Sequence, residues 1–142
     1  MFNITILYGS SCIGKSSTME TMKDSFLKLE MDDCEYWLLP EKERENKCIA
    51  FLIDSIKSNI SSSSRDMVVT CGYLPLPNDQ IYRKIETDYG IKLKHILILV
   101  KDRGDYIKYI KKRGNDDQVN QLLKDYEWRE NNKNLYDSIL FN

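Results

Sequence analysis

Short apolar runs alternate along the chain with longer stretches whose apolar residues recur at helical spacing. The apolar runs predict five strands, at residues 2–8, 26–31, 67–71, 95–100 and 137–141. The stretches between them predict helices at about 16–24, 41–60, 80–89, 106–112 and 117–131. Strands that alternate with helices in this way are typical of an α/β fold with a mostly parallel sheet.

The first predicted strand leads directly into Gly9-Ser10-Ser11-Cys12-Ile13-Gly14-Lys15-Ser16, which fits the pattern G-x-x-x-x-G-K-S in full. Glycines let a backbone wrap closely around a phosphate, and successive N–H groups then cradle the anion. In such a loop, Lys15 reaches the β- and γ-phosphates and the Ser16 hydroxyl ligates Mg²⁺. The loop follows a strand and opens a helix, as this chemistry requires, so the sequence predicts a nucleotide-binding site here.

Composition narrows the class of protein further. The chain has 142 residues with 21 basic and 22 acidic side chains, which predicts one domain and excludes a strongly basic nucleic-acid-binding character. No apolar run approaches the roughly 20 residues of a membrane span. Its four cysteines are scattered and it has a single histidine, a pattern that favours a reducing cytoplasm over a zinc or disulfide framework.

Acidic residues narrow the class within nucleotide-binding proteins. No guanine-recognition motif of the NKxD type is present, and the third predicted strand ends in Thr70-Cys71-Gly72 without the carboxylate that a motor-type ATPase carries. The acidic pair Asp32-Asp33 instead follows the second predicted strand. Because parallel strands end on one edge of a sheet, either carboxylate is expected to face the γ-phosphate. There it can orient the waters of Mg²⁺ or accept a proton from an attacking hydroxyl.

Positive charge gathers after the fourth predicted strand, in a region of about residues 101–117 that we call the lid. Its basic side chains are Lys101, Arg103, Lys108, Lys111, Lys112 and Arg113. Phosphoryl transfer needs cations close to the γ-phosphate, and a mobile segment can supply them while it excludes water. A solvated basic helix face accounts equally well for Lys108 and Lys111, so Arg113 is the candidate catalytic and nucleotide-binding residue.

Three segments, YGSSCIGKSS, LEMDDCEYWLLP and RGDYIKYIKKRGNDD, together resemble the small P-loop kinases. This group includes shikimate kinase, gluconate kinase, chloramphenicol phosphotransferase and the kinase part of phage polynucleotide kinase. The ending RENNKNLYDSILFN is similar to that of shikimate kinase. The resemblance implies a single three-layer domain over residues 1–142, with helices on both faces of a mostly parallel five-stranded sheet in the order 2-3-1-4-5.

The resemblance also assigns roles to individual residues. It implies that ATP phosphates and Mg²⁺ bind at Gly9, Ser10, Ser11, Cys12, Ile13, Gly14, Lys15, Ser16 and Ser17. It makes Lys15, Asp32, Asp33 and Arg113 the catalytic candidates, with Ser16 and Asp32 as the metal ligands. Arg129 is similar to an arginine that contacts phosphate or acceptor, and Gly72 occupies the place of a glycine-rich acceptor loop. The segment VNQLLK lacks an arginine found in many relatives, and the closing segment on the adenine side is expected to be missing or short.

The acceptor pocket is expected to form from about residues 33–64 and the loop that begins at Gly72. Tyr36, Trp37 and Tyr73 offer aromatic walls, although such residues serve equally well in a core. A phosphorylated acceptor needs a convergent arginine clamp, and only Arg44 is well placed for one. The sequence therefore favours a neutral or weakly charged hydroxyl acceptor.

These observations predict an ATP-dependent kinase that phosphorylates a hydroxyl of a small molecule. Two alternatives stay open at this point. One is a nucleoside, nucleotide or polynucleotide 5′-kinase, and the other is an ATP-binding regulatory protein without turnover. The identity of the acceptor, the preference for ATP over GTP and the oligomeric state are left open by the sequence.

Overall fold

The computed structural model of the protein describes residues 2–30, 39–70 and 72–142. Within these ranges, five strands form one sheet in which all neighbouring strands are parallel, in the order β2-β3-β1-β4-β5. The strands are β1 (Asn3–Tyr8), β2 (Leu27–Glu30), β3 (Met67–Thr70), β4 (Lys92–Leu99) and β5 (Ser138–Phe141). This is the P-loop NTPase arrangement, so the predicted fold class and strand order are confirmed.

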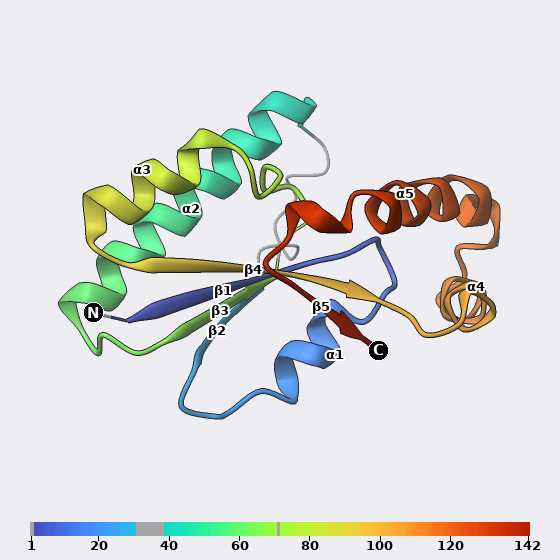
Figure 1. Cartoon of the computed structure of the whole chain (residues 1–142), viewed down its shortest axis with the longest axis horizontal. Coiled ribbons are helices and arrows are strands. Elements are labelled where there is room, and N and C mark those ends of the chain that lie inside the picture. Colours follow the sequence, from blue (N-terminus) through green and yellow to red (C-terminus); the bar gives the residue numbers. More distant parts are fainter. Residues whose placement is uncertain (1, 31–38, 71) are drawn as a thin grey trace.

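Helices cover both faces of the sheet. They are α1 (Lys15–Glu20), α2 (Glu41–Ser61), α3 (Gln80–Tyr89), α4 (Arg103–Lys112) and α5 (Val119–Asn131), with short 3₁₀ turns η2 (Asp116–Gln118) and η3 (Lys133–Leu135). Figure 1 shows α2, α3 and α5 on one side of the sheet and α1 on the other, with α4 beyond the end of β4. None of the helices in the described ranges combines the length and apolar character needed to cross a membrane.

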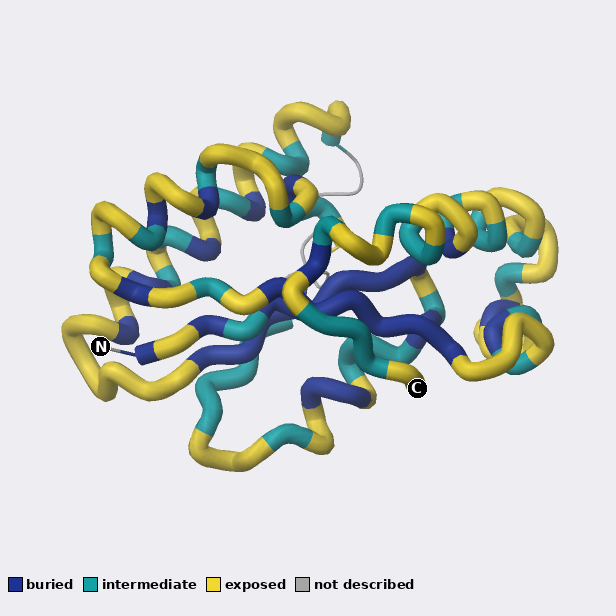
Figure 2. The backbone as a smooth tube through the Cα atoms, in the orientation of Figure 1, coloured by how far each residue is buried: buried dark blue, intermediate teal, exposed yellow. Residues whose placement is uncertain are grey.

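The sheet forms the centre of the core, which Figure 2 shows as a band of buried backbone between exposed helix surfaces. Ile4 and Ile6 of β1 are fully buried, as expected for the central strand of a sheet that is covered on both faces. In α2, the buried residues Cys48, Leu52 and Ile56 recur every four positions, so one stripe of this helix faces the sheet.

Element boundaries differ from the predicted ones where a side chain fixes an end. The fourth helix was expected from residue 106, but α4 begins at Arg103 because Asp102 Oδ1 accepts a hydrogen bond from the Gly104 amide at 2.7 Å. The fourth strand starts at Lys92 rather than His95, and its lysines Lys92 and Lys94 are exposed at the amino-terminal end. The last helix begins only after the 3₁₀ turn η2.

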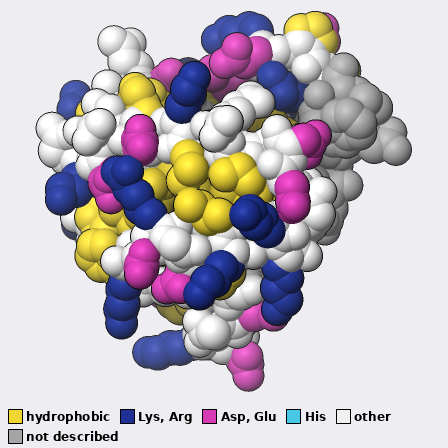
Figure 3. Space-filling view, turned by 90° about the vertical axis from the view of Figure 1, so that its right-hand side faces the viewer, with side chains coloured by type: hydrophobic (Ala, Val, Ile, Leu, Met, Phe, Trp, Pro, Cys, Tyr) yellow, Lys and Arg dark blue, Asp and Glu magenta, His cyan; other side chains and the backbone are white. Residues whose placement is uncertain are grey.

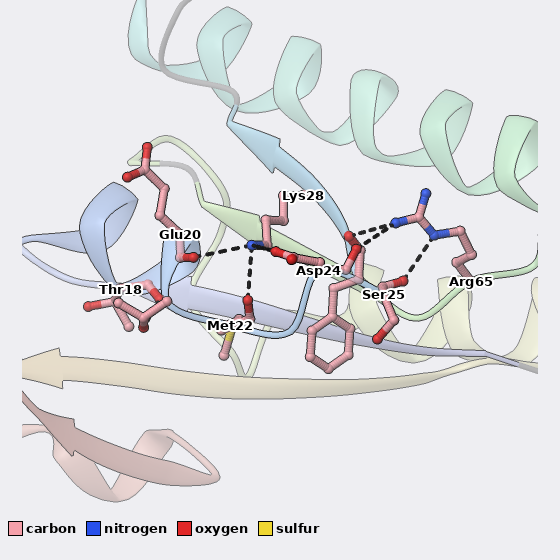
Figure 4. Close-up of polar contacts among 9 residues, drawn as sticks. Thr18, Glu20, Met22, Asp24, Ser25, Lys28 and Arg65 are labelled. Atoms are coloured by element: carbon pink, nitrogen blue, oxygen red, sulfur yellow. Dashed lines mark hydrogen bonds and ion pairs between the residues drawn. The ribbon is translucent and has the colours of Figure 1, made fainter.

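The first helix is also shorter than the predicted 16–24, because the chain turns back after Glu20 to enter β2. Figure 4 shows how two basic side chains hold this connection. Lys28 Nζ donates to the carbonyl oxygens of Glu20 and Met22 at 3.3 and 3.0 Å. Arg65 reaches the same connection from the other side and donates to the carbonyl oxygens of residues 24–26 at 2.9–3.1 Å. The bonded carbonyls end the helix and fix where β2 begins.

Candidate functional site

The loop from Gly9 to Ser16 joins β1 to α1 at the carboxyl edge of the sheet. Two of its positions require glycine. Gly14 has φ 100°, and a Cβ there would lie 2.3 Å from Nδ2 of the Asn142 side chain. A Cβ on Gly9 would lie 2.6 Å from the Ile13 side chain. Side chains therefore pack directly against the loop backbone at both glycines, which leaves no room for a larger residue.

Side chains from distant elements hold the backbone of this loop. Tyr106 of α4 donates a hydrogen bond to the Ser11 carbonyl oxygen at 2.7 Å, and Asn142 Nδ2 donates to the Ile13 carbonyl oxygen at 2.9 Å. Asn115 Nδ2 lies 3.5 Å from Cys12 Sγ. Burial raises the pKa of the Tyr106 phenol, so the phenol stays protonated and keeps donating at neutral pH. The loop is thus shaped by the lid and by the residue that follows β5.

Lys15 and Ser16 are the two residues with the strongest predicted chemistry. Both line a cleft that opens above the Gly9–Ser16 loop. Lys15 Nζ donates to the carbonyl oxygen of Gly9 at 2.9 Å, so its ammonium group lies folded over its own loop. The Ser16 hydroxyl donates to Oε1 of Glu30. Glu30 is the last residue of β2 and is paired in register with Thr70 of β3.

Glu30 is the residue that the sequence reasoning missed. The carboxylates that the sequence predicts for this edge are Asp32 and Asp33, which follow the second predicted strand. A usable signal was present in the strand itself, because Lys28 and Glu30 are the polar positions that alternate with Leu27 and Leu29. A carboxylate at the last position of such a strand points to the same edge as the Gly9–Ser16 loop.

The hydroxyl of Ser16 and the carboxylate of Glu30 fit a magnesium ion chemically, because Mg²⁺ prefers oxygen ligands and keeps several waters. The metal is usually held by only one or two protein groups together with substrate phosphates. In the described ranges, no three His, Cys, Asp or Glu side chains gather closely enough to hold a metal by themselves. A hydroxyl and a carboxylate together suit an ion that is bound along with substrate phosphates.

A single cleft of about 1520 Å³ connects the predicted nucleotide and acceptor residues. Its floor is the Gly9–Ser16 loop with Glu30. One wall comes from the start of α2 and the loop 72–80, and the other from the lid and α5. Of the predicted site residues, it is lined by Gly9, Ser11, Cys12, Ile13, Gly14, Lys15, Ser16, Arg44, Gly72, Tyr73, Arg113 and Arg129.

Several predicted site residues are not among those that line the cleft. Ser10 is buried within the loop, and Ser17 is exposed on α1. Asp32, Asp33, Tyr36 and Trp37 lie outside the described residues, so their assigned roles stay predictions.

Arg44 and Tyr73 form the acceptor-side wall. The guanidinium carbon of Arg44 lies 5.1 Å from the centre of the Tyr73 ring, a cation–π arrangement that fixes the plane of the guanidinium group. Arg44 Nε is buried and has no hydrogen-bond partner among the described residues. A buried donor without a partner is costly, so this nitrogen is well suited to bind a group that enters the cleft.

On the opposite wall, Arg113 and Arg129 are held in different ways. Arg113 is exposed at the carboxyl-terminal end of α4. Arg129 is largely buried, with its side chain 17% exposed, and its Nε donates to Asp125 Oδ2 at 3.1 Å. Arg129 therefore has a fixed position, whereas Arg113 is free of such an ion pair within the described ranges.

The lid as a whole does not place its positive charge over the cleft. Arg103 donates to Glu127 and Glu130 of α5 at 3.0 and 2.7 Å, and these charged hydrogen bonds raise its pKa further. Figure 3 shows that basic and acidic side chains are mixed on the α4–α5 face, around a hydrophobic area at its centre. Of the basic side chains of the lid, Arg113 lines the cleft, so it is the lid residue placed to contact the phosphates.

Comparisons with known proteins add little to this geometry. No family model matches the chain, and no curated protein matches it. Among solved structures, the protein is similar to a gluconokinase from Sinorhizobium meliloti 1021, with 16% sequence identity over 86% of this chain and 73% of that one. The TM-score of 0.49 is too low to transfer an activity. The fold and the cleft define a P-loop NTPase-like protein, and its activity has to be argued from the cleft itself.

Proposed function

We propose that this protein is an ATP-dependent kinase that transfers the γ-phosphate of ATP to a hydroxyl group of a small molecule. The observation that carries the proposal is the continuity of the cleft. It joins a glycine loop with Lys15 and Ser16 to a second pocket lined by Arg44 and Tyr73. A protein that only binds a nucleotide needs the first part, whereas group transfer needs both parts side by side.

Each residue of the cleft has a separate role in the proposed transfer. The Gly9–Ser16 loop holds the phosphate chain, and Lys15 leaves the Gly9 carbonyl to contact the β- and γ-phosphates. Ser16 and Glu30, together with the predicted ligand Asp32, provide oxygens for Mg²⁺, which neutralises charge on the phosphates when bound. Arg113 adds positive charge beside the transferred group. Asp32 or Asp33 is proposed to accept the proton of the attacking hydroxyl.

A transfer assay tests this proposal. Purified protein is incubated with γ-labelled ATP, Mg²⁺ and a panel of hydroxyl compounds that includes sugar acids, nucleosides and aminoglycols. Transfer to at least one acceptor is expected, and Lys15→Ala is expected to lower kcat/KM by at least 100-fold because it removes the charge at the phosphates. Lys23→Ala is the matched control, since Lys23 is exposed on the α1–β2 connection. Nucleotide binding without transfer to any acceptor would favour a regulatory protein instead.

One observation favours a different acceptor from the neutral or weakly charged one that the sequence favoured. The buried Nε of Arg44, which has no hydrogen-bond partner in the part of the chain that the structure describes, suits a carboxylate or phosphate better than a neutral group. We therefore propose that the acceptor carries an anionic group in addition to its hydroxyl. Nucleoside monophosphates belong to this class.

Pairs of acceptors that differ only in the anionic group test this point. The acid is expected to have a KM roughly 10- to 100-fold lower than its amide or alcohol, because a charge-assisted hydrogen bond contributes about 1.5–3 kcal/mol. Arg44→Gln is expected to abolish the difference between the two members of a pair. Equal KM values for both members in the parent protein would exclude an anionic acceptor.

A further inference from the structure

Cys12, in the middle of the Gly9–Ser16 loop, has a left-handed backbone with φ 68° although it is not a glycine. This conformation crowds the Cβ atom of any residue with a side chain, so surrounding contacts must hold it in place. Gly14, with φ 100°, is a second left-handed position in the same loop. Such changes of hand turn successive N–H groups towards one side, where they can surround an anion. The loop is therefore strained at the place where its backbone is shaped for a phosphate.

Two side chains of the lid contact this turn. The hydroxyl of Tyr106, which is fully buried, donates a hydrogen bond to the Ser11 carbonyl oxygen at 2.7 Å. That carbonyl belongs to the peptide group that joins Ser11 to Cys12, so the bond fixes the plane on which φ of Cys12 depends. The side-chain amide of Asn115 lies 3.5 Å from Cys12 Sγ. One contact therefore holds the backbone of the turn and the other holds its side chain.

Both of these lid residues are held in place by the rest of the fold. The ring of Tyr106 packs against that of Tyr126 in α5, with centroids 5.1 Å apart. At the other end of α4, Gly114 has φ 76°, and the amide of the following Asn115 donates to the Ile110 carbonyl oxygen at 3.2 Å. A left-handed glycine followed by such a bond is a common helix ending, and it fixes the first residues beyond the helix. The end of α4 thus directs the Asn115 side chain to the loop.

We propose that Tyr106 and Asn115 are positioning residues for the nucleotide, because they hold the turn at Cys12 in the conformation that presents the N–H groups of the loop to the phosphates. The lid then acts on the phosphate chain through the backbone of the loop, in addition to the charge of Arg113. Coupling between two sites is reciprocal, so a bound nucleotide also stabilises α4. The choice of ATP as the ligand rests on the proposed function, whereas the effect of the lid on the loop does not depend on transfer.

Nucleotide affinity measures this role directly. Tyr106→Phe keeps the packed ring but loses the hydrogen bond to the loop. Its Kd for a nonhydrolysable ATP analogue with Mg²⁺, measured by isothermal titration calorimetry, is expected to rise roughly fivefold, which corresponds to the net contribution of one hydrogen bond. Asn115→Ala is expected to raise the Kd roughly twofold, because sulfur is a weak hydrogen-bond partner. Tyr109→Phe, at an exposed tyrosine of the same helix, is the matched control. Equal Kd values for Tyr106→Phe and Tyr109→Phe overturn the proposal.

A second substitution at Cys12 separates this positioning role from a general loss of stability. Glycine adopts a positive φ without strain, so in a Cys12→Gly background the turn no longer depends on the lid. Tyr106→Phe is expected to raise the Kd by no more than about twofold in that background. Cys12→Ala is the matched background, because alanine removes the sulfur but keeps the Cβ atom, and the roughly fivefold loss is expected to remain there. An equal loss in both backgrounds overturns the action of Tyr106 through the turn.

Hydrogen exchange tests the reciprocal effect and does not depend on transfer. The ATP analogue is expected to slow exchange of the α4 amides in the parent protein and to slow it less in Tyr106→Phe, whereas exchange in residues 52–61 of α2 stays unchanged. Unchanged exchange in α4 overturns the proposal, as does failure of the parent protein to bind the analogue. If the analogue protects α4 but the parent protein transfers phosphate to no acceptor, the proposed function fails and the positioning role stands.

Discussion

The contact between Ser16 and Glu30 places a carboxylate where the hydroxyl of a glycine loop is expected to meet Mg²⁺. Glu30 ends β2 next to Thr70 of β3, in the sheet region where motor-type ATPases carry their acid on the third strand. In this chain, the carboxylate that the structure describes at this edge is Glu30, and it comes from β2 rather than from β3. At the scale of single residues, this is the observation that most sharpens the proposed mechanism, because it can be tested without knowing the acceptor.

Glu30→Gln is expected to weaken the binding of Mg²⁺ together with the nucleotide. The substitution keeps the size of the side chain and a hydrogen-bond acceptor for Ser16 but removes the charge. The Mg²⁺ concentration for half-maximal ATP binding is expected to rise roughly tenfold, which is typical when a group that orients a metal ligand is lost. Titration of a fluorescent ATP analogue at a series of Mg²⁺ concentrations measures this value. Glu20→Gln, at the exposed end of α1, is the control, and an equal Mg²⁺ dependence in both variants would contradict a role for Glu30.

At the scale of elements, β2 holds α1 at both of its ends. Lys28 and Glu30 are two positions apart and therefore point to the same face of the strand. Lys28 donates to the carbonyl oxygens of Glu20, the last residue of α1, and of Met22 just beyond it (Figure 4). Glu30 accepts a hydrogen bond from the hydroxyl of Ser16 in the first turn of α1. A helix of only six residues has few hydrogen bonds of its own, so these two contacts fix its position.

Lys28→Met is therefore expected to destabilise the fold. Methionine keeps the apolar part of the side chain but loses the ammonium group that bonds Glu20 and Met22. The free energy of unfolding is expected to fall by about 1–2 kcal/mol, because the ammonium group is partly exposed and its ion pair with the exposed Asp24 contributes little. Urea unfolding monitored by tryptophan fluorescence measures the change. Lys23→Met, from the same connection, is expected to have no measurable effect, and equal stability of the two variants would rule out this role.

At the scale of the whole molecule, the sequence predicted the order of neighbouring elements well, but it did not predict contacts between residues far apart in the chain. The strand β1, the glycine loop and α1 are neighbours in the sequence, so their order was readable from pattern alone. Contacts such as Tyr8 with His95 join residues 87 positions apart. They depend on the register that pairs Ile6 of β1 with His95 of β4, which no local pattern specifies. The same holds for Arg103, whose partners on α5 became visible only in the folded chain.

The burial of His95 predicts how the stability of the whole molecule depends on pH. Burial lowers the pKa of His95 below its ordinary value of 6.5, and the nearby carboxylates Asp137 and Glu86 oppose this effect only in part. Between the lowered pKa and 6.5, the unfolded chain binds more protons than the folded one, so stability is lost as the pH falls below about 6.5. His95→Gln removes this titration. The difference in free energy of unfolding between the parent protein and His95→Gln is therefore expected to be largest at pH 7.5 and to shrink towards pH 5.5, before most carboxylates titrate. Denaturant unfolding at both pH values measures it, and a difference that does not change with pH would show that His95 titrates as readily in the folded chain as in the unfolded one.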